Sequence, residues 1–99
     1  MKLIMCLVDK MEDEIDDAES YYDLAVKYSD YPELARSLKE IANQELTHFQ
    51  ILHNRTVEIV NKLKSSRDID NGMLGAYDYL HEKLVKHVNN VKFKIKELD

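Results

Sequence analysis

Residues 4–25, IMCLVDKMEDEIDDAESYYDLA, decide the fold class of this chain. Apolar residues recur along this segment in alternating steps of four and three, the spacing of a seam on one side of an α-helix. The seam consists of Ile4, Val8, Met11, Ile15, Ala18, Tyr22 and Ala25. The pattern predicts a first helix over residues 3–29, and a helix of this length with one apolar side is typical of helical bundles.

Two further helices follow from the same periodicity. Residues 29–33, SDYPE, combine a helix stop with a helix start, because Pro32 suits a first helical turn and Glu33 complements the helix dipole. We therefore expect a tight turn and an antiparallel second helix over residues 32–64. Polar turn formers occupy residues 65–72, and the apolar period resumes in a third helix over residues 73–98. The predicted fold is all-α, an antiparallel helical hairpin plus a third helix, in one domain over residues 1–99.

Composition and charge narrow the class of protein. The chain has 99 residues, and nineteen acidic residues against fourteen basic ones give a net charge of −5. This balance argues against nucleic-acid binding, which depends on clustered Lys and Arg. A chain this short has a marginal core, so we expect the bundle to be completed by oligomerisation.

The N-terminal segment indicates where the protein is located in the cell and what its single cysteine can do. Its apolar run is short and passes into the acidic stretch after Asp9, so we expect neither a signal peptide nor a membrane span, and a cytoplasmic protein. The single cysteine, Cys6, excludes an intrachain disulfide, and we expect its side chain to be buried as a small apolar residue.

Two carboxylates on the predicted apolar stripes suggest a metal site. Glu45 falls near the middle of the second helix's stripe, and Glu19 falls within that of the first. The two residues lie equally far from Pro32 in sequence, so antiparallel helices bring them to within about one turn of the same level. Neither stripe offers a Lys or Arg there, and an uncompensated buried carboxylate is costly. We expect a shared proton or a bound metal ion between them.

Further polar residues extend this candidate site. Glu45 and His48 form a Glu-x-x-His pair, in which residues three apart on a helix let a carboxylate oxygen and an imidazole nitrogen reach one ion. His81 lies near the edge of the third helix's stripe and is a candidate additional ligand, or a residue that supports the ligands from behind. Tyr22 and Tyr77 also point inward, either as core residues or as hydrogen-bond donors behind the metal ligands.

Residues 13–60 resemble the ferritin-like superfamily, most of all the short encapsulated-ferritin and rubrerythrin-type proteins. The resemblance rests on the aromatic pair Tyr21-Tyr22, on the turn that contains Pro32-Glu33-Leu34, and on Glu45-x-x-His48. It implies a di-iron centre that oxidises Fe(II) with oxygen, built from a Glu on each of two helices and a Glu-x-x-His on each of two others. Two copies of this chain about a two-fold axis would supply the set, which implies a homodimer or a higher even-numbered homo-oligomer. A larger protein shell as a partner is left open.

The first-helix ligand is open among three acids. In the relatives a carboxylate usually stands seven residues before the aromatic residue, and Ile15 occupies that place relative to Tyr22, whereas Glu14 stands seven before Tyr21. By helical angle Glu14 points off the stripe, Glu12 lies near its edge and Glu19 lies within it, so we expect Glu19. Glu45 and His48 complete the expected ligands of iron, for which manganese or zinc could substitute. The alternative function is a metal-free helical adaptor or assembly protein that acts through protein contacts.

Overall fold

Three long helices make up the structure. The computed structural model describes residues 2–98, with side chains for residues 2–97. It contains α1 (Lys2–Lys27), α2 (Pro32–Ser66) and α3 (Asn71–Leu98), and no strand within the described residues. The predicted all-α class and the three helices are confirmed, and each boundary lies within two residues of its expected position. Met1 and Asp99, the ends of the predicted domain, lie outside the described residues.

Local signals explain why the loop between α2 and α3 is shorter than predicted. Arg67 ends α2 in the left-handed conformation, at φ 60° and ψ 30°, and its amide and that of Asp68 donate to carbonyls of the last turn of α2. Asp70 then caps α3, because its Oδ1 accepts a 2.8 Å hydrogen bond from the amide of Met73. The loop is thus confined to residues 67–70, and Gly72, which we expected in the loop, lies in the first turn of α3.

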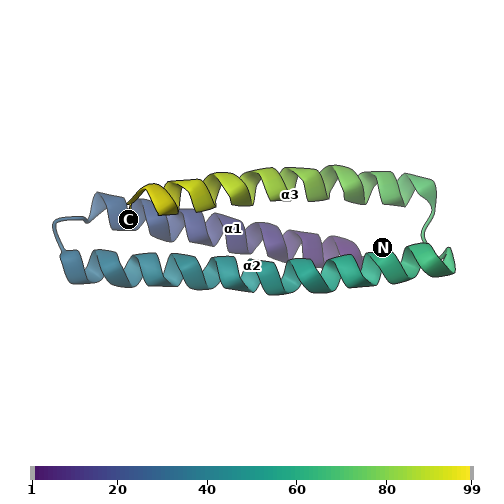
Figure 1. Ribbon diagram of the computed structural model, residues 1–99, viewed down its shortest axis with the longest axis horizontal. Helices are drawn as coiled ribbons and strands as arrows, with labels where there is room; N and C mark the ends of the chain where they lie inside the picture. The colour runs from purple at the N-terminus through teal and green to yellow at the C-terminus, as the bar shows by residue number, and fades with distance from the viewer. Residues whose placement is uncertain (1, 99) are drawn as a thin grey trace.

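The helices run side by side along one axis (Figure 1). α1 and α2 form an antiparallel hairpin, and α3 returns along it, antiparallel to α2, so that the C-terminus lies at the same end as the α1–α2 turn. The molecule measures 54 × 19 × 17 Å. α1 therefore has two neighbours, with α2 on one flank of its apolar seam and α3 on the other.

The core lies between the three helices. From α1 it contains six of the seven seam residues, namely Ile4, Val8, Met11, Ile15, Ala18 and Ala25, while Tyr22 is half-buried. The other helices add Ala42, Leu46, Phe49, Val60, Tyr77, Leu84, Val88, Val91 and Ile95. Thr56 is the buried polar residue of the described chain, and its hydroxyl donates to the carbonyl of Leu52 at 2.7 Å. A single chain thus covers the α1 seam, because α3 packs over the hairpin.

Two findings concern the N-terminal segment and the membrane. The side chain of Cys6 is exposed, so the expectation that it is buried was wrong: the seam passes through Ile4 and Val8, and Cys6 lies on the outer side of the same helix. Over residues 2–98, none of the helices carries an apolar stretch that would suffice to span a bilayer.

Candidate metal centre

Glu14 of α1 meets Glu45 and His48 of α2. One potential ligand atom from each residue lies within 4.8 Å of the others. His48 Nδ1 lies 3.5 Å from Oε2 of Glu14 and 3.7 Å from Oε2 of Glu45. The two glutamate side chains are 22% and 19% exposed, whereas that of His48 is 55% exposed. The cluster is therefore set into the hairpin on its carboxylate side and open to solvent on its imidazole side.

The position of the turn determines which acid of α1 faces Glu45. α1 ends at Lys27 and α2 begins at Pro32, so the middle of the turn falls between Ser29 and Asp30. Glu14 and Glu45 lie equally far from that point. Our expectation measured the register from Pro32, which shifted the partner of Glu45 towards Glu19. In addition, Glu14 lies beside the apolar seam of α1, on the flank that faces α2. Although it is not part of the seam, its side chain therefore reaches the neighbouring helix.

The two carboxyl groups of this cluster disfavour each other's charge. The pKa of Glu45 lies above its ordinary value of 4.5, first because of hydrogen bonding with the carboxyl of Glu14, then because of burial and repulsion by the Glu14 charge; His48 acts in the opposite direction. Such a hydrogen bond requires a proton on one of the two groups. When neither group is protonated, Oε2 of Glu14 is buried and, among the described residues, has no hydrogen-bond partner. The nearby His48 adds a positive charge only when its imidazole is protonated.

The donor set fits a divalent transition-metal ion. Two carboxylates and an imidazole are ligands that iron, manganese and zinc accept in proteins. The buried Oε2 atom of Glu14 is an acceptor that a cation at this position would satisfy. Three protein ligands leave coordination positions for water or a substrate, and the exposed His48 shows that they would face solvent.

Glu19, the expected first-helix ligand, lies in a different cluster. Its Oε2 accepts a 2.8 Å hydrogen bond from Nζ of Lys94, and its Oε1 lies 3.5 Å from Nε2 of His87. The pKa of Glu19 lies below 4.5, first because of the hydrogen bond from Lys94 and despite partial burial. The cation that pairs with Glu19 thus comes from α3, whereas the expectation of a metal ion or a shared proton concerned only the first two helices. Since it lies on the flank of α1 that faces α3, Glu19 is separated from Glu45.

His81 and the two tyrosines also lie apart from the Glu14 cluster. His81 pairs with His53 of α2, with their Nε2 atoms 2.8 Å apart. Tyr77 is buried next to this pair, with its ring centroid 5.5 Å from that of His81, and burial raises its pKa above 10.0. Tyr22 packs against the core. His53 and His87 meet their partners on other helices, so no pattern within a single helix indicates these contacts.

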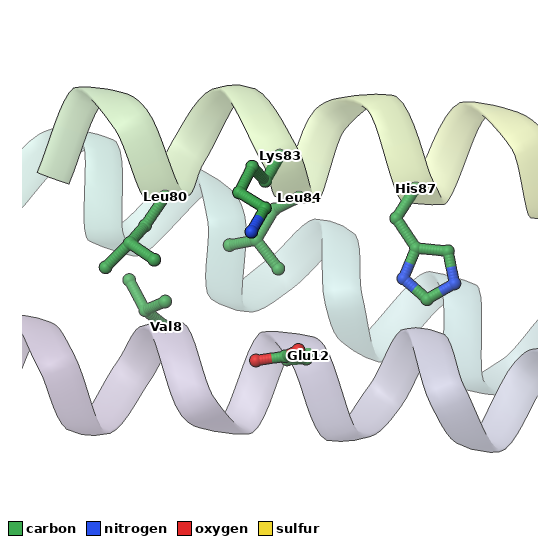
Figure 2. Close-up of a pocket in the computed structure, with 6 residues that line it drawn as sticks. All are labelled: Val8, Glu12, Leu80, Lys83, Leu84 and His87. Atoms are coloured by element: carbon green, nitrogen blue, oxygen red, sulfur yellow. The ribbon is translucent and has the colours of Figure 1, made fainter.

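Glu12, the third acid considered, faces α3 as well. It lines a cavity of about 290 Å³ between α1 and α3 with Val8, Leu80, Leu84, Lys83 and His87. Figure 2 shows the side chains of Lys83 and His87 reaching down from α3 towards α1, with Glu12 below them. Of the three candidate acids of α1, Glu14 is thus the one that joins Glu45 and His48.

Comparisons with known proteins add no relative. No family model matches the chain, and neither the curated proteins nor the solved structures contain a match. The functional argument therefore rests on the residues of this chain.

Proposed function

We propose that this protein binds a divalent first-row transition-metal ion through Glu14, Glu45 and His48. One observation carries the proposal: Oε2 of Glu14 is buried without a hydrogen-bond partner among the described residues, within reach of a second carboxylate and an imidazole. A cation relieves the repulsion between the two acids and satisfies this oxygen. The mixed oxygen and nitrogen donors favour iron, manganese or zinc over calcium.

The resemblance to ferritin-like proteins makes Fe(II) the proposed substrate. Two bound Fe(II) ions would each give one electron to O2, which would take up two protons and leave as hydrogen peroxide. This reaction would make the protein a ferroxidase. The residues of the chain have two tasks in this reaction. Glu14 and Glu45 supply the negative charge that favours the oxidised ion, and His48 supplies a nitrogen ligand at the solvent side, where iron and oxygen enter.

A second copy of the chain fits this proposal. Three protein ligands suffice for one metal ion that keeps open coordination positions, whereas a di-iron centre needs more protein ligands than three. The solvent-facing side of His48 is the place where a partner related by a two-fold axis would add its own Glu14, Glu45 and His48. We therefore propose a homodimer, or a higher even-numbered oligomer, in the metal-bound state.

The decisive experiment compares Glu14→Gln with Glu19→Gln. Both variants remove one half-buried carboxylate of α1 and preserve its shape, but only Glu14 belongs to the cluster. Metal content is measured by mass spectrometry after expression in iron-supplemented cells, and Fe(II) oxidation is followed optically. We expect Glu14→Gln to lose bound iron and oxidation, and Glu19→Gln to retain both. Equal iron in the two variants overturns the proposal.

Two further measurements separate the parts of the proposal. The double variant Glu45→Gln, His48→Gln should lose iron as Glu14→Gln does, since it removes the remaining ligands. Sedimentation with and without Fe(II) tests association, and a monomer under both conditions contradicts the dimer but leaves the single-ion site standing. Iron binding without oxidation contradicts the ferroxidase. A protein that takes up no metal would leave the adaptor function as the better interpretation.

A further inference from the structure

A second pair of metal-ligand side chains joins α2 to α3. Nε2 of His53 and Nε2 of His81 lie 2.8 Å apart, and the two rings are nearly parallel, with 23° between their planes and 5.0 Å between their centroids. These residues come from different helices and are 28 positions apart in sequence. The pair is separate from the Glu14 cluster and takes no part in the proposed function.

The surroundings of this pair are aromatic on two sides and polar on a third. The ring of Phe49 lies 5.7 Å from that of His53, and the ring of Tyr77 lies 5.5 Å from that of His81. A cavity of about 170 Å³ opens beside His81, and its polar lining residues are Asn61, Lys64, Tyr77 and Asp78. Both imidazoles are half-buried. The pair is thus partly shielded from bulk water but borders a space in which water and oxygen ligands have room.

In the metal-free protein the two nitrogens need one proton between them. Neutral imidazoles can form this contact only if one donates and the other accepts. Burial lowers the pKa of His81 below 6.5, the neighbouring His53 lowers it further, and Asp78 acts in the opposite direction. The environment of His81 therefore favours its uncharged form, and the uncharged imidazole is the form that ligates metals.

The spacing of the two nitrogens also suits metal ligation. Nitrogen ligands bind zinc at about 2.0–2.1 Å, so two of them on one ion lie about 2.9 Å apart at a right angle and about 3.4 Å apart at a tetrahedral angle. The observed 2.8 Å is close to the first value and needs a small rotation of the rings for the second.

We propose that His53 and His81 form a second metal site, which takes a borderline ion such as Zn²⁺ or Cu²⁺ in place of the shared proton. Imidazole pairs select such ions over Mg²⁺ and Ca²⁺. Water in the cavity beside His81 would complete the coordination. Nδ1 of His53 is buried and has no partner among the described residues, so the outer hydrogen bond that strengthens many histidine ligands is absent. We expect weaker binding here than at the Glu14 cluster, and an ion that ties α3 to α2.

The test uses the full chain with the other site removed. In the Glu14→Gln, Glu45→Gln background, Cu²⁺ is added and its electron paramagnetic resonance spectrum is recorded, while Zn²⁺ is titrated by calorimetry. We expect one Cu²⁺ with two nitrogen ligands and one Zn²⁺ per chain. His53→Gln and His81→Gln should each weaken Zn²⁺ binding at least 10-fold, whereas the control His87→Gln should leave it unchanged.

A direct measurement on the background protein keeps the test valid if either histidine variant fails to fold. Zn²⁺ should shift the ring signals of His53 and His81 in ¹H–¹⁵N spectra and leave those of His87 in place. Zn²⁺ that perturbs other histidines first, or Cu²⁺ with a single nitrogen ligand, overturns the second site. Because the background lacks Glu14 and Glu45, neither result bears on the proposed iron site.

Discussion

Lys94 on α3 donates a 2.8 Å hydrogen bond to Oε2 of Glu19 on α1. This ion pair holds the C-terminal part of α3 against α1, at a position 13 residues along α3 from His81. It also explains why a half-buried carboxylate on α1 is tolerated without a metal ion. The half-buried acidic residues of α1 therefore lie on two different flanks of the helix, one facing α2 and one facing α3.

Replacing Lys94 by Gln should raise the pKa of Glu19. The hydrogen bond from Lys94 is the main reason that the pKa of Glu19 lies below 4.5. Partial burial raises this pKa, and the variant removes the hydrogen bond that outweighs the effect of burial. A lowered carboxyl pKa stabilises the fold above the unfolded-state value, and this contribution is lost as pH falls through the folded-state value. Carboxyl NMR titration of Lys94→Gln measures the change. Lys92→Gln, on the same helix, is the control and should leave the titration of Glu19 in place.

Glu45→Gln should stabilise the metal-free protein while it abolishes metal binding. The pKa of Glu45 lies above 4.5 because of its neighbour Glu14, so the folded state binds the proton more tightly and its stability falls as pH rises through that pKa. Where both carboxyl groups are ionised their charges repel, and a neutral amide removes a cost on the order of a few tenths of a kcal/mol. Denaturant unfolding with a chelator at pH 7 measures the gain. A clear loss of stability would contradict the like-charge contact.

Stability of the metal-free protein should decline as pH falls below about 6.5. The pKa of His81 is lowered by burial and by His53, so the unfolded state binds more protons between the folded-state pKa and 6.5. The contribution is present above this window and is lost within it. Unfolding curves at pH 7.5 and 5.5 with a chelator measure the difference, and it should shrink in His81→Gln. An unchanged difference in that variant would show that other groups cause the decline.

Arg67→Gly should stabilise the protein by roughly 0.5–1 kcal/mol. Arg67 adopts φ 60°, where a side chain costs about 1–2 kcal/mol, and glycine avoids this at the expense of a more flexible unfolded chain. Arg67→Ala retains the Cβ atom and should give no such gain, so it is the matched control. Thermal unfolding of the two variants, compared with the parent, measures both effects.

The sequence was sufficient to predict the helices, because each one carries an uninterrupted apolar period and clear end signals. The burial of apolar residues such as Ile15 on α1 and Val88 on α3 follows from periodicity alone, and both are buried. The exact helix ends were less predictable. The left-handed conformation of Arg67 and the cap at Asp70 depend on how the chain turns into α3, and either residue also suits a longer loop.

The candidate site was predictable only within one helix. Glu45 and His48 are three residues apart on one helix, and their proximity to each other follows from helix geometry. Their partner on α1 depends on the register of the hairpin and on the flank that faces α2, and an error of a few residues in the middle of the turn exchanges Glu14 for Glu19. The His53–His81 contact needs the position of α3 as well, which no pattern within a single helix contains.

All three proposed iron ligands belong to the hairpin, and none comes from α3. Undocking of the third helix would therefore leave the iron ligands in place. In the proposed iron protein, capture of iron and closure of the bundle would be two separable events, and each could evolve, or be engineered, without rebuilding the other.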